Sequence, residues 1–387
     1  MKILFVTTCY PDEGNSNYCV FLEQQAKALF DGSNRVDVLF IKEGGTDKKE
    51  YVFNGVPVTE YPIRRSKKYE IIIPTSLSKS DSRGLEKIIS GGYDIVSFHF
   101  GGNKIKRSLI KVCRKLDIPI VLHFHGLNVW YEYKEKYKLL YAWYRLQYKR
   151  IYKKANAAVG VSDKVSGNFS KRVKTVPVYT VYNGVDIDRF PYNNKTGFMK
   201  PLRLLCVANL IELKGQDLLI KAVAELGKKG IDCELTLVGK GPFKNRLEEL
   251  AEDSGVSEKV FFKGELPYDE ISPVMQDSDI FVMPSHYEAL GCVYIEAMAS
   301  GMITVGVKGQ GIDELIDNNK NGFLVSPKSV TSIVETVESI LATDPEIISQ
   351  ISAAARETAK KFTWSNSAKS LLEVYEKTIS LYREGKN

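Results

Sequence analysis

Two glutamates, Glu288 and Glu296, flank a turn between a strand-like run and a helix-like run. A carboxylate pair could act as acid and nucleophile on a glycoside, which requires carboxyl groups roughly 5–9.5 Å apart. Eight residues of helix would separate them by about 12 Å. The spacing therefore predicts that they contact different parts of one extended ligand, with two solvated side chains as the alternative. Gly291, at the start of the helix, would let backbone N–H groups approach a phosphate closely.

Lys214 and His125 are two further side chains in positions suited to ligand binding. Lys214 follows a strand-like run and a turn, and His125 ends the strand-like run 118–125. Doubly wound folds bind their ligands at the C-terminal ends of such strands. An exposed lysine and a histidine satisfied within its own loop are the structural alternatives.

Residues that could bind a metal ion are present but poorly arranged for it. The six cysteines form no Cys-x-x-Cys pair, and most lie in apolar runs, as buried thiols do. We therefore expect a reducing compartment, no disulfide and no zinc site. Two Asp-x-Asp pairs occur, one in a predicted linker and one in a helix-to-strand turn: Asp186/Asp188 and Asp277/Asp279. No metal is expected at either pair.

Short β-branched runs alternate with helical periodicities through most of the chain. This alternation predicts an α/β fold with parallel sheets covered by helices on both faces. In the first half, the predicted strands are 2–8, 35–41, 93–100, 118–125 and 157–162, and the predicted helices include 19–30, 103–116 and 130–154. In the second half, the predicted strands are 202–210, 233–239, 259–264, 279–285, 302–308 and 322–325, and the chain is helical from 329 onward.

The segment 186–201 contains Gly, Pro and Asn without a clear period, so we predict a domain linker there. It separates an N-terminal domain, 1–185, from a C-terminal domain, 202–365. The last helix, 366–387, is expected to pack back on the N-terminal domain. Two doubly wound, Rossmann-like domains in tandem would bind a ligand in the cleft between them, at the C-terminal ends of their strands.

The net charge of +7 is unevenly distributed. Residues 1–199 carry a net charge of +14, whereas residues 200–387 carry −7. A basic half joined to an acidic half predicts different partners for the two halves. No apolar run approaches the ~20 residues of a membrane-spanning helix, and the apolar run at the N-terminus is too short for a signal peptide. A cytoplasmic protein is expected.

The segment 130–154 carries eight basic residues, two acidic residues and nine aromatic residues. Six tyrosines recur at intervals of three or four and would form one helical stripe: Tyr133, Tyr137, Tyr141, Tyr144, Tyr148 and Tyr152. Basic residues with aromatic side chains suit an anionic membrane surface. Burial of the stripe against the protein's own sheet is the favoured alternative, and no nucleic-acid-binding motif is recognised.

The segment 284–301 resembles the Glu-x7-Glu signature of the family 4 retaining glycosyltransferases. That family has the GT-B architecture, in which two Rossmann-like doubly wound domains face each other across a cleft. Further segments resemble motifs of the family in the same order: 161–163, 182–190, 207–220, 238–242, 262–271 and 309–325. The resemblance covers nearly the whole chain and is tightest over 180–325. It implies a GT-B fold and an enzyme of the type that assembles bacterial surface polysaccharides.

The resemblance also implies roles for individual residues. Glu288 would contact the donor sugar, Lys214 would neutralise the leaving diphosphate, and His125 would lie near the donor sugar or the acceptor. These three are the expected catalytic residues. Glu296 would hold the ribose hydroxyls. The donor-binding residues implied by the resemblance are Glu296, Asn209, Gly264, Leu266, Leu290, Gly291 and Cys292.

The sequence departs from the family pattern at several places, one of which is the absence of the family's double Gly from the segment 10–29. Asn209 stands where the family usually has Arg, and Asn cannot replace a bidentate, charged grip on phosphate. The family's Gly-Phe between Glu288 and Gly291 is Ala-Leu here. Asn128 stands where the loop after His125 usually has an acidic residue, so no general base is assigned.

These features predict a retaining glycosyltransferase that moves a sugar from a nucleotide-diphosphate donor, with a UDP-sugar favoured. The donor is expected on the C-terminal domain, and a saccharide or lipid-linked saccharide acceptor on the basic N-terminal domain. The nucleotide sugar is a substrate, and neither cofactor nor metal is expected, because Lys214 and a helix N-terminus would supply the metal's electrostatic effect. Contact with the inner face of the membrane through 130–154 stays open. A non-hydrolysing nucleotide-sugar epimerase and an inactive sugar-nucleotide-binding protein are the alternatives.

Overall fold

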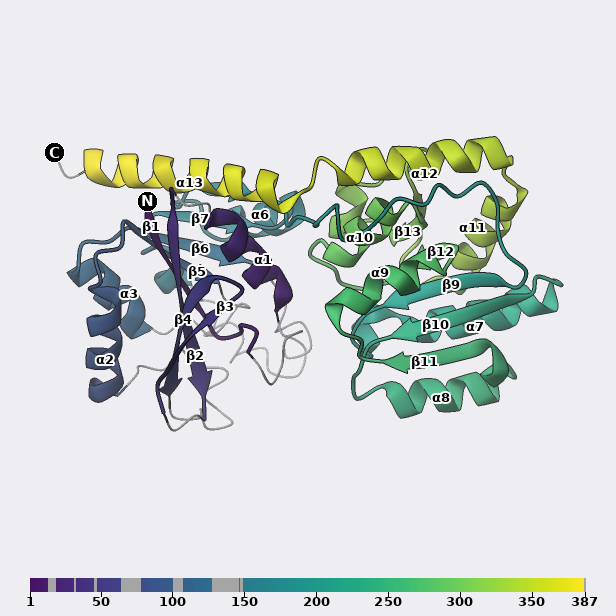
Figure 1. Cartoon of the computed structure of the whole chain (residues 1–387), viewed down its shortest axis with the longest axis horizontal. Coiled ribbons are helices and arrows are strands. Elements are labelled where there is room, and N and C mark those ends of the chain that lie inside the picture. Colours follow the sequence, from purple (N-terminus) through teal and green to yellow (C-terminus); the bar gives the residue numbers. More distant parts are fainter. Residues whose placement is uncertain are drawn as a thin grey trace. The chain divides into compact units, whose positions relative to one another are not determined.

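The computed structural model describes residues 1–12, 19–30, 33–44, 47–63, 78–99, 107–126, 146 and 149–385 (Figure 1). All of the predicted site residues lie within these ranges. Most of the predicted helix 130–154 lies outside them, and so does Asn128. Within the described ranges, no helix is long and apolar enough to cross a bilayer.

The chain divides into two compact units. The first contains residues 1–183 together with 364–387, and the second contains residues 184–363. Each unit is built on its own largely parallel sheet, with strands and helices alternating along the chain.

The first unit contains an eight-stranded sheet in the order β3-β4-β2-β1-β5-β6-β7-β8. Its strands are β1 (Lys2–Thr7), β2 (Arg35–Glu43), β3 (Lys49–Phe53), β4 (Val56–Ile63), β5 (Ile95–His99), β6 (Ile120–Phe124), β7 (Ala157–Gly160) and β8 (Val178–Thr180). All neighbouring strands are parallel except β3 and β4, which form an antiparallel hairpin. Every residue of β5 and β6 is buried, as expected for central strands covered on both faces.

Five described helices belong to the first unit: α1 (Val20–Leu29), α2 (Lys79–Ile89), α3 (Arg107–Lys115), α6 (Asp163–Ser170) and α13 (Trp364–Glu384). The C-terminal helix α13 packs beside α1, although the two are far apart in the sequence (Figure 1). Leu371 and Tyr375 of α13 join the same buried cluster as Phe5 of β1 and Leu22 of α1. The last helix therefore completes the core of the first unit.

The second unit contains a six-stranded parallel sheet in the order β11-β10-β9-β12-β13-β14. Its strands are β9 (Leu202–Val207), β10 (Cys233–Val238), β11 (Val260–Gly264), β12 (Ile280–Val282), β13 (Ile303–Val307) and β14 (Phe323–Val325). Counted from β9, this is the strand order 3-2-1-4-5-6 of the dinucleotide-binding fold. The order reverses between β9 and β12, and ligands bind at such a reversal in open α/β sheets.

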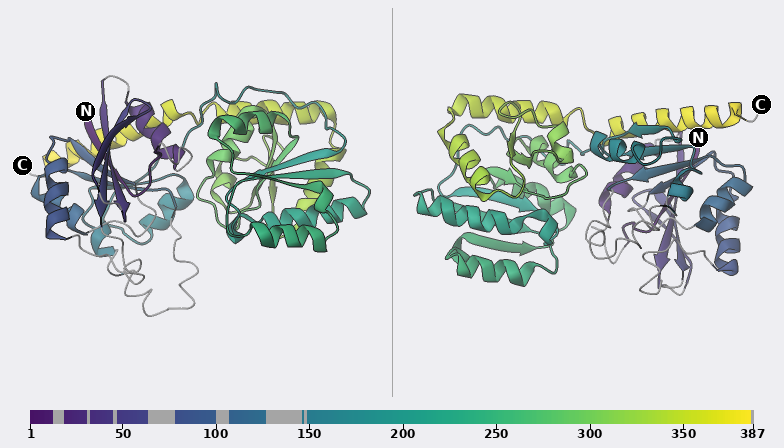
Figure 2. Two further views of the ribbon diagram at one scale, coloured as in Figure 1. Left: turned by 60° about the horizontal axis from the view of Figure 1, so that its bottom comes forward. Right: turned by 180° about the vertical axis from the view of Figure 1, so that it is seen from behind.

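Helices cover both faces of the second sheet (Figure 2). They are α7 (Gln216–Lys228), α8 (Lys244–Asp253), α9 (Tyr268–Gln276), α10 (Cys292–Ser300), α11 (Val330–Ala342) and α12 (Pro345–Ala359). Three short 3₁₀ helices lie between them: η1 (Glu212–Lys214), η2 (Ser257–Lys259) and η3 (Gly311–Glu314). The second unit is therefore a doubly wound, Rossmann-like fold.

The segment 186–201 differs from the linker that its composition predicts, because it packs as part of the second unit. Arg356 of α12 donates to the carbonyl of Phe190 at 2.7 Å, and the N–H of Asn193 donates to the carbonyl of Ser300 at 3.0 Å. The ammonium of Lys195 lies 3.8 Å from the carboxylate of Asp279. These long-range partners satisfy a segment that has no regular period of its own.

All six cysteines lie in the described ranges, and none forms a disulfide. Cys113, Cys206 and Cys233 are buried in apolar surroundings, and burial raises the pKa of each thiol. These three thiols are accordingly protonated and poorly reactive at neutral pH.

Candidate active site

The reversal point of the second sheet brings Lys214 and Glu288 together. Lys214 ends η1, which follows β9, and Glu288 lies in the loop that follows β12. The ammonium Nζ lies 2.5 Å from the carboxylate Oε2, although the two residues are 74 positions apart. The side chains retain 21% and 12% of their exposure, so the pair is shielded but still accessible. A ligand here meets a cation and a carboxylate side by side.

Backbone contacts hold the Glu288 loop in place. The N–H of Glu288 donates to Oε1 of Gln310 at 3.0 Å, and its carbonyl accepts from the N–H of Gly311 at 3.1 Å. On the other side, the N–H of His286 donates to the carbonyl of Leu213 at 2.8 Å, next to Lys214. Hydrogen bonds to the segments 309–311 and 212–214 thus hold the loop at residues 286 and 288. Gln310 is a supporting residue that the sequence analysis did not single out.

Gly291 begins α10 with a positive φ of 79° and provides no side-chain cap. A Cβ at this position would lie 2.8 Å from Cδ2 of Tyr294 and 3.2 Å from Cγ of Glu288. Glycine therefore lets the backbone turn sharply while Glu288 stays close. The uncapped N-terminus of α10 presents backbone N–H groups and a positive dipole end, which is a favourable environment for phosphate.

Glu296 lies on α10 and is 7% exposed. The hydroxyl of Tyr268 donates to its Oε1 at 2.9 Å. Burial raises the pKa of Glu296 to about 7, against the opposing effects of the Tyr268 hydrogen bond and the charge of Arg189. The guanidinium of Arg189 lies 4.7 Å from the centre of the Tyr268 ring. Tyr268, which the sequence analysis placed only within the segment 262–271, is therefore the direct partner of Glu296.

The remaining predicted donor-binding residues fall around the C-terminal edge of the same sheet. Gly264 ends β11 and accepts a backbone hydrogen bond from Gly239 at 2.7 Å. Leu290 is 1% exposed, whereas Leu266 and Cys292 are partly exposed. Asn209 follows β9 directly and is exposed, and its backbone carbonyl accepts from the side-chain amide of Gln216 at 3.0 Å.

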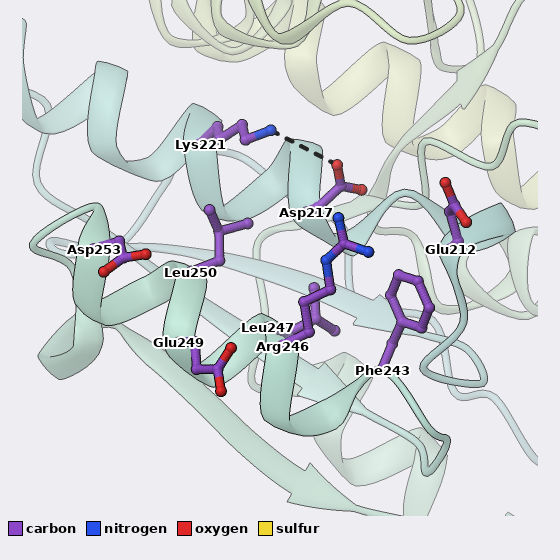
Figure 3. Close-up of a pocket in the computed structure, with 9 residues that line it drawn as sticks. All are labelled: Glu212, Asp217, Lys221, Phe243, Arg246, Leu247, Glu249, Leu250 and Asp253. Atoms are coloured by element: carbon purple, nitrogen blue, oxygen red, sulfur yellow. Dashed lines mark ion pairs between the residues drawn. The ribbon is translucent and has the colours of Figure 1, made fainter.

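A separate pocket of about 270 Å³ lies between η1, α7 and α8 (Figure 3). Its lining residues are Glu212, Asp217, Lys221, Phe243, Arg246, Leu247, Glu249, Leu250 and Asp253. Four of these are acidic and two are basic, and Lys221 already pairs with Asp217 at 3.9 Å. The pocket contains none of the predicted site residues, and its acidic excess disfavours a diphosphate. It is therefore a poor alternative to the Lys214–Glu288 region.

The first unit places His125 in a cluster of three imidazoles at the C-terminal ends of β5 and β6. His99 and His123 are each 1% exposed, whereas His125 is partly exposed. Nδ1 of His99 lies 3.1 Å from Nε2 of His125, and Nε2 of His99 lies 3.0 Å from Oγ of Ser97. Burial lowers the pKa of all three imidazoles, that of His125 to about 3, so they are uncharged at neutral pH. The sequence analysis identified His125 but neither of its neighbours.

Asp186 and Asp279, one from each Asp-x-Asp pair, bind groups of the protein itself. Oδ2 of Asp279 accepts from the backbone N–H of Arg203 at 2.9 Å, and its Oδ1 faces Lys195. Oδ1 of Asp186 accepts from the backbone N–H of Asp188 at 3.2 Å.

The end of the segment 130–154 that the structure describes has two faces. Ile151 is buried, and the ring of Tyr152 lies 5.4 Å from those of Phe124 and Phe169 in the core. The basic residues on the other face are exposed: Lys149, Arg150, Lys153 and Lys154. At this end the last tyrosine of the predicted stripe packs against the protein's own core.

Two doubly wound units, the second with a cation and two carboxylates at its C-terminal edge, define the GT-B class of glycosyltransferases. The profile of the family described as glycosyl transferases group 1 matches residues 188–361. The profile described as glycosyltransferase family 4 matches residues 20–189. Together they cover most of the chain, which belongs to the family 4 glycosyltransferases.

Proteins with similar sequences are also named as glycosyltransferases. An uncharacterized glycosyltransferase of Methanocaldococcus jannaschii is 26% identical over 97% of this chain and 98% of that protein. A putative colanic acid biosynthesis glycosyltransferase, WcaL of Salmonella typhimurium, is 24% identical over 68% of this chain and 65% of that protein. A GDP-mannose-dependent phosphatidylinositol monomannoside mannosyltransferase of Mycolicibacterium smegmatis is 33% identical over 46% of this chain and 50% of that protein.

Among solved structures, Alr3699/HepE of Anabaena in complex with UDP is similar with a TM-score of 0.71. The alignment covers 97% of this chain and all of that one, at 18% identity. The GT-B fold predicted from the sequence is thus confirmed.

Proposed function

We propose that the chain is a retaining glycosyltransferase that moves a sugar from a nucleotide-diphosphate donor to a saccharide or lipid-linked saccharide. The Lys214–Glu288 pair at the reversal point of the second sheet carries this proposal. A diphosphate needs a cation and N–H donors, which Lys214 and the N-terminus of α10 offer. A sugar needs acceptors for its hydroxyls, which Glu288 offers.

The donor fits this region as one extended ligand. Glu296, two turns into α10, accepts hydrogen bonds from the ribose hydroxyls, with Tyr268 holding its carboxylate. Gly264 and Leu266 contact the base, and Leu290, Gly291 and Cys292 surround the diphosphate. Lys214 also compensates for Asn209, which brings no charge to the end of β9.

The reaction is a front-face displacement. The bond between the anomeric carbon and the phosphate oxygen breaks, and its electron pair stays on the diphosphate. The acceptor oxygen bonds to the same face of that carbon, and its proton passes to the departing phosphate oxygen. Lys214 and the backbone N–H groups stabilise the charge that develops on the diphosphate. Positioning supplies the remainder of the rate enhancement, with no metal in the step.

A UDP-sugar is the favoured donor, and surface polysaccharide is the favoured product, made in the cytoplasm. The UDP-bound Anabaena structure and the colanic acid relative support these choices, whereas the mannosyltransferase relative makes a GDP-sugar the competing donor. His125 is assigned to the donor sugar or the acceptor on the first unit.

Donor hydrolysis tests the proposal without knowledge of the acceptor. UDP-glucose, GDP-mannose and ADP-glucose are incubated with the wild type and with Glu288→Gln, and nucleotide release is measured. Proton NMR assigns the anomer of the sugar that is released first. We expect release from the UDP-sugar, an α-anomer from the α-linked donor, and at least a tenfold loss in the variant. A β-anomer first would exclude retention. An altered sugar that is still attached to the nucleotide, with no release of free sugar, would favour the non-hydrolysing epimerase alternative.

Membrane contact through the segment 130–154 is a separate part of the proposal. Flotation with anionic liposomes should weaken when the exposed residues Lys149, Arg150, Lys153 and Lys154 are all changed to Gln. Equal flotation of both proteins would exclude this contact.

A further inference from the structure

Three of the four histidines in the chain project from one edge of the first sheet. His123 and His125 are two residues apart along β6 and its extension, so they lie on the same face. His99 ends the neighbouring strand β5 and is the direct partner of His123 in the parallel register. The strands therefore bring together imidazoles that no sequence motif connects.

The nitrogen atoms are close to the spacing of metal ligands. One ring nitrogen from each histidine lies within 4.8 Å of the other two. Nδ1 of His99 and Nε2 of His125 are 3.1 Å apart. A tetrahedral zinc ion with Zn–N bonds of about 2.0–2.1 Å places its ligand nitrogens about 3.3 Å apart. Small side-chain rotations would therefore bring the third imidazole into place.

The hydrogen bonds of the cluster are incomplete without a further group. Among the described residues, neither ring nitrogen of His123 has a hydrogen-bond partner, although the residue is only 1% exposed. Within the same part of the chain, Nδ1 of His125 also lacks a partner. Buried polar atoms in native proteins are almost always satisfied, so these three nitrogens without partners call for an explanation.

Ser97 supports one imidazole as an outer partner supports a metal ligand. If Nε2–H of His99 donates to Oγ of Ser97, then Nδ1 of His99 presents its lone pair toward His125. Ligating histidines usually hold their second nitrogen in such a hydrogen bond. The rings of Phe5 and Phe21 lie 4.0 Å and 4.7 Å from His99 and His125, and they limit access by water.

We propose that His99, His123 and His125 bind one divalent transition-metal ion of the Zn²⁺ type, with water or an anion in the fourth position. Three neutral imidazoles favour Zn²⁺, Co²⁺, Ni²⁺ and Cu²⁺ over Mg²⁺ and Ca²⁺, which prefer oxygen ligands. The sequence expectation of no metal came from spacings along the chain, whereas this site comes from strand register. The metal site shares His125 with the proposed transfer reaction, but metal binding is measured without that reaction, so either proposal can fail while the other stands.

The test is a titration of chelator-treated protein with Co²⁺ and with Zn²⁺. Calorimetry measures the binding of each ion, and visible absorption reports bound Co²⁺. His123→Phe keeps an aromatic ring in the stack but removes both nitrogens. His286→Asn removes the one histidine outside the cluster and is the matched control. We expect one ion per chain in the wild type and in His286→Asn, and at least a tenfold weaker affinity in His123→Phe.

A second variant covers the case in which His123→Phe folds poorly. Ser97→Ala leaves all three ligands in place and removes only the outer partner, so it should weaken binding by about 10–100-fold. Melting in chelator reports whether each variant is folded. Binding of Mg²⁺ with equal affinity would overturn the proposal. Binding that survives both cluster variants but disappears after cysteine alkylation would also overturn it, as would no binding of Zn²⁺ or Co²⁺ by the wild type.

Discussion

The two units place different chemistry at the same position of the same fold. In the second unit, the reversal between β9 and β12 carries the Lys214–Glu288 ion pair. In the first unit, the sheet reverses between β1 and β5, and β5 ends in His99 of an uncharged imidazole cluster. One site offers charges to a ligand, whereas the other offers lone pairs.

The comparison shows why net charge is a poor guide to ligand choice. Residues 1–199 carry a net charge of +14 and residues 200–387 carry −7, yet Lys214, the cation that we propose to bind the diphosphate, lies in the acidic half. Charges spread over a surface are screened within about 8–10 Å at physiological ionic strength. A single shielded cation beside a helix N-terminus acts at contact distance, so local geometry outweighs the total.

The largest effect should follow loss of the cation at the second reversal point. Lys214→Met keeps the aliphatic stem and removes the charge that we propose to stabilise the leaving diphosphate. We expect donor turnover to fall by about 10²–10³-fold, the range measured when a charge-stabilising group is removed. Initial rates of nucleotide release measure it.

Lys221→Met is the control, because Lys221 lies on the neighbouring helix α7 and forms an exposed pair with Asp217. Exposed pairs contribute about 0–1 kcal/mol, so this variant should keep turnover within about twofold. Equal losses of turnover in the two variants would mean that Lys214 contributes only to the overall positive charge of the region and makes no specific contact with the donor.

The titration of Glu296 gives the next largest effect. A carboxyl in the unfolded chain titrates near 4.5, whereas burial places the pKa of folded Glu296 at about 7. Between these values the folded protein holds a proton that the unfolded chain has lost. The free energy of unfolding should therefore fall as the pH rises from 5 to 8, by up to about 3 kcal/mol from this group. Glu296→Gln cannot titrate and should be the more stable protein at pH 8.

Urea unfolding of both proteins at pH 5 and pH 8 measures this difference, and parallel pH profiles would contradict it. Binding should move the other way. The diphosphate of UDP-glucose stays fully charged in this range. Its ribose hydroxyls donate hydrogen bonds, and the ionised carboxylate of Glu296 is a better acceptor than the protonated form. The affinity of UDP-glucose for the wild type should therefore rise through pH 7, and Glu296→Gln should lack this rise.

Two glycines distinguish backbone strain from side-chain crowding at the second site. Gly264 and Gly291 have similar φ values, 71° and 79°. A Cβ at Gly264 would meet nothing within 4 Å, whereas one at Gly291 would press on Tyr294 and Glu288. We expect Gly264→Ala to lose about 1 kcal/mol of stability from its left-handed backbone. Gly291→Ala should lose about 1–3 kcal/mol more from overpacking, and it should also lower donor turnover because Glu288 is displaced.

Chemical denaturation and nucleotide release, measured on the same two preparations, test this pair. If both variants lost equal stability and equal turnover, crowding at Glu288 would play no part.

Much of the fold follows from periodicity, because central strands are short apolar runs. The run 233–239, for example, contains β10 (Cys233–Val238). The hairpin strand β3 was missed because it lies at the sheet edge and alternates exposed with half-buried residues. The segment 186–201 was predicted as a linker because its composition is that of a loop. The groups that bind it, the carbonyl of Ser300 and the guanidinium of Arg356, come from α10 and α12.

The site was only partly predictable for a related reason. Glu288, Glu296 and Lys214 lie in recognisable segments, so they could be proposed as site residues from the chain alone. Their partners could not be inferred, because the hydrogen bonds of Gln310 and Tyr268 connect separate loops. His99 and His123 each sit inside an apolar strand and look like core residues when taken one at a time. Only the register of β5 with β6 shows that they face each other.

The smallest predicted effect is also the sharpest contrast with Lys214. His123→Phe, studied without metal, removes two buried nitrogens that lack partners and keeps a ring against His125, whose centre lies 4.5 Å away. Replacing unsatisfied polar atoms by apolar ones of similar shape is nearly neutral or stabilising. We expect the free energy of unfolding to stay within about 1 kcal/mol of the wild type or to rise, as measured by urea denaturation in chelator. A loss above about 2 kcal/mol would show that the imidazole stabilises the metal-free fold, and that the two sites are less different than their charges suggest.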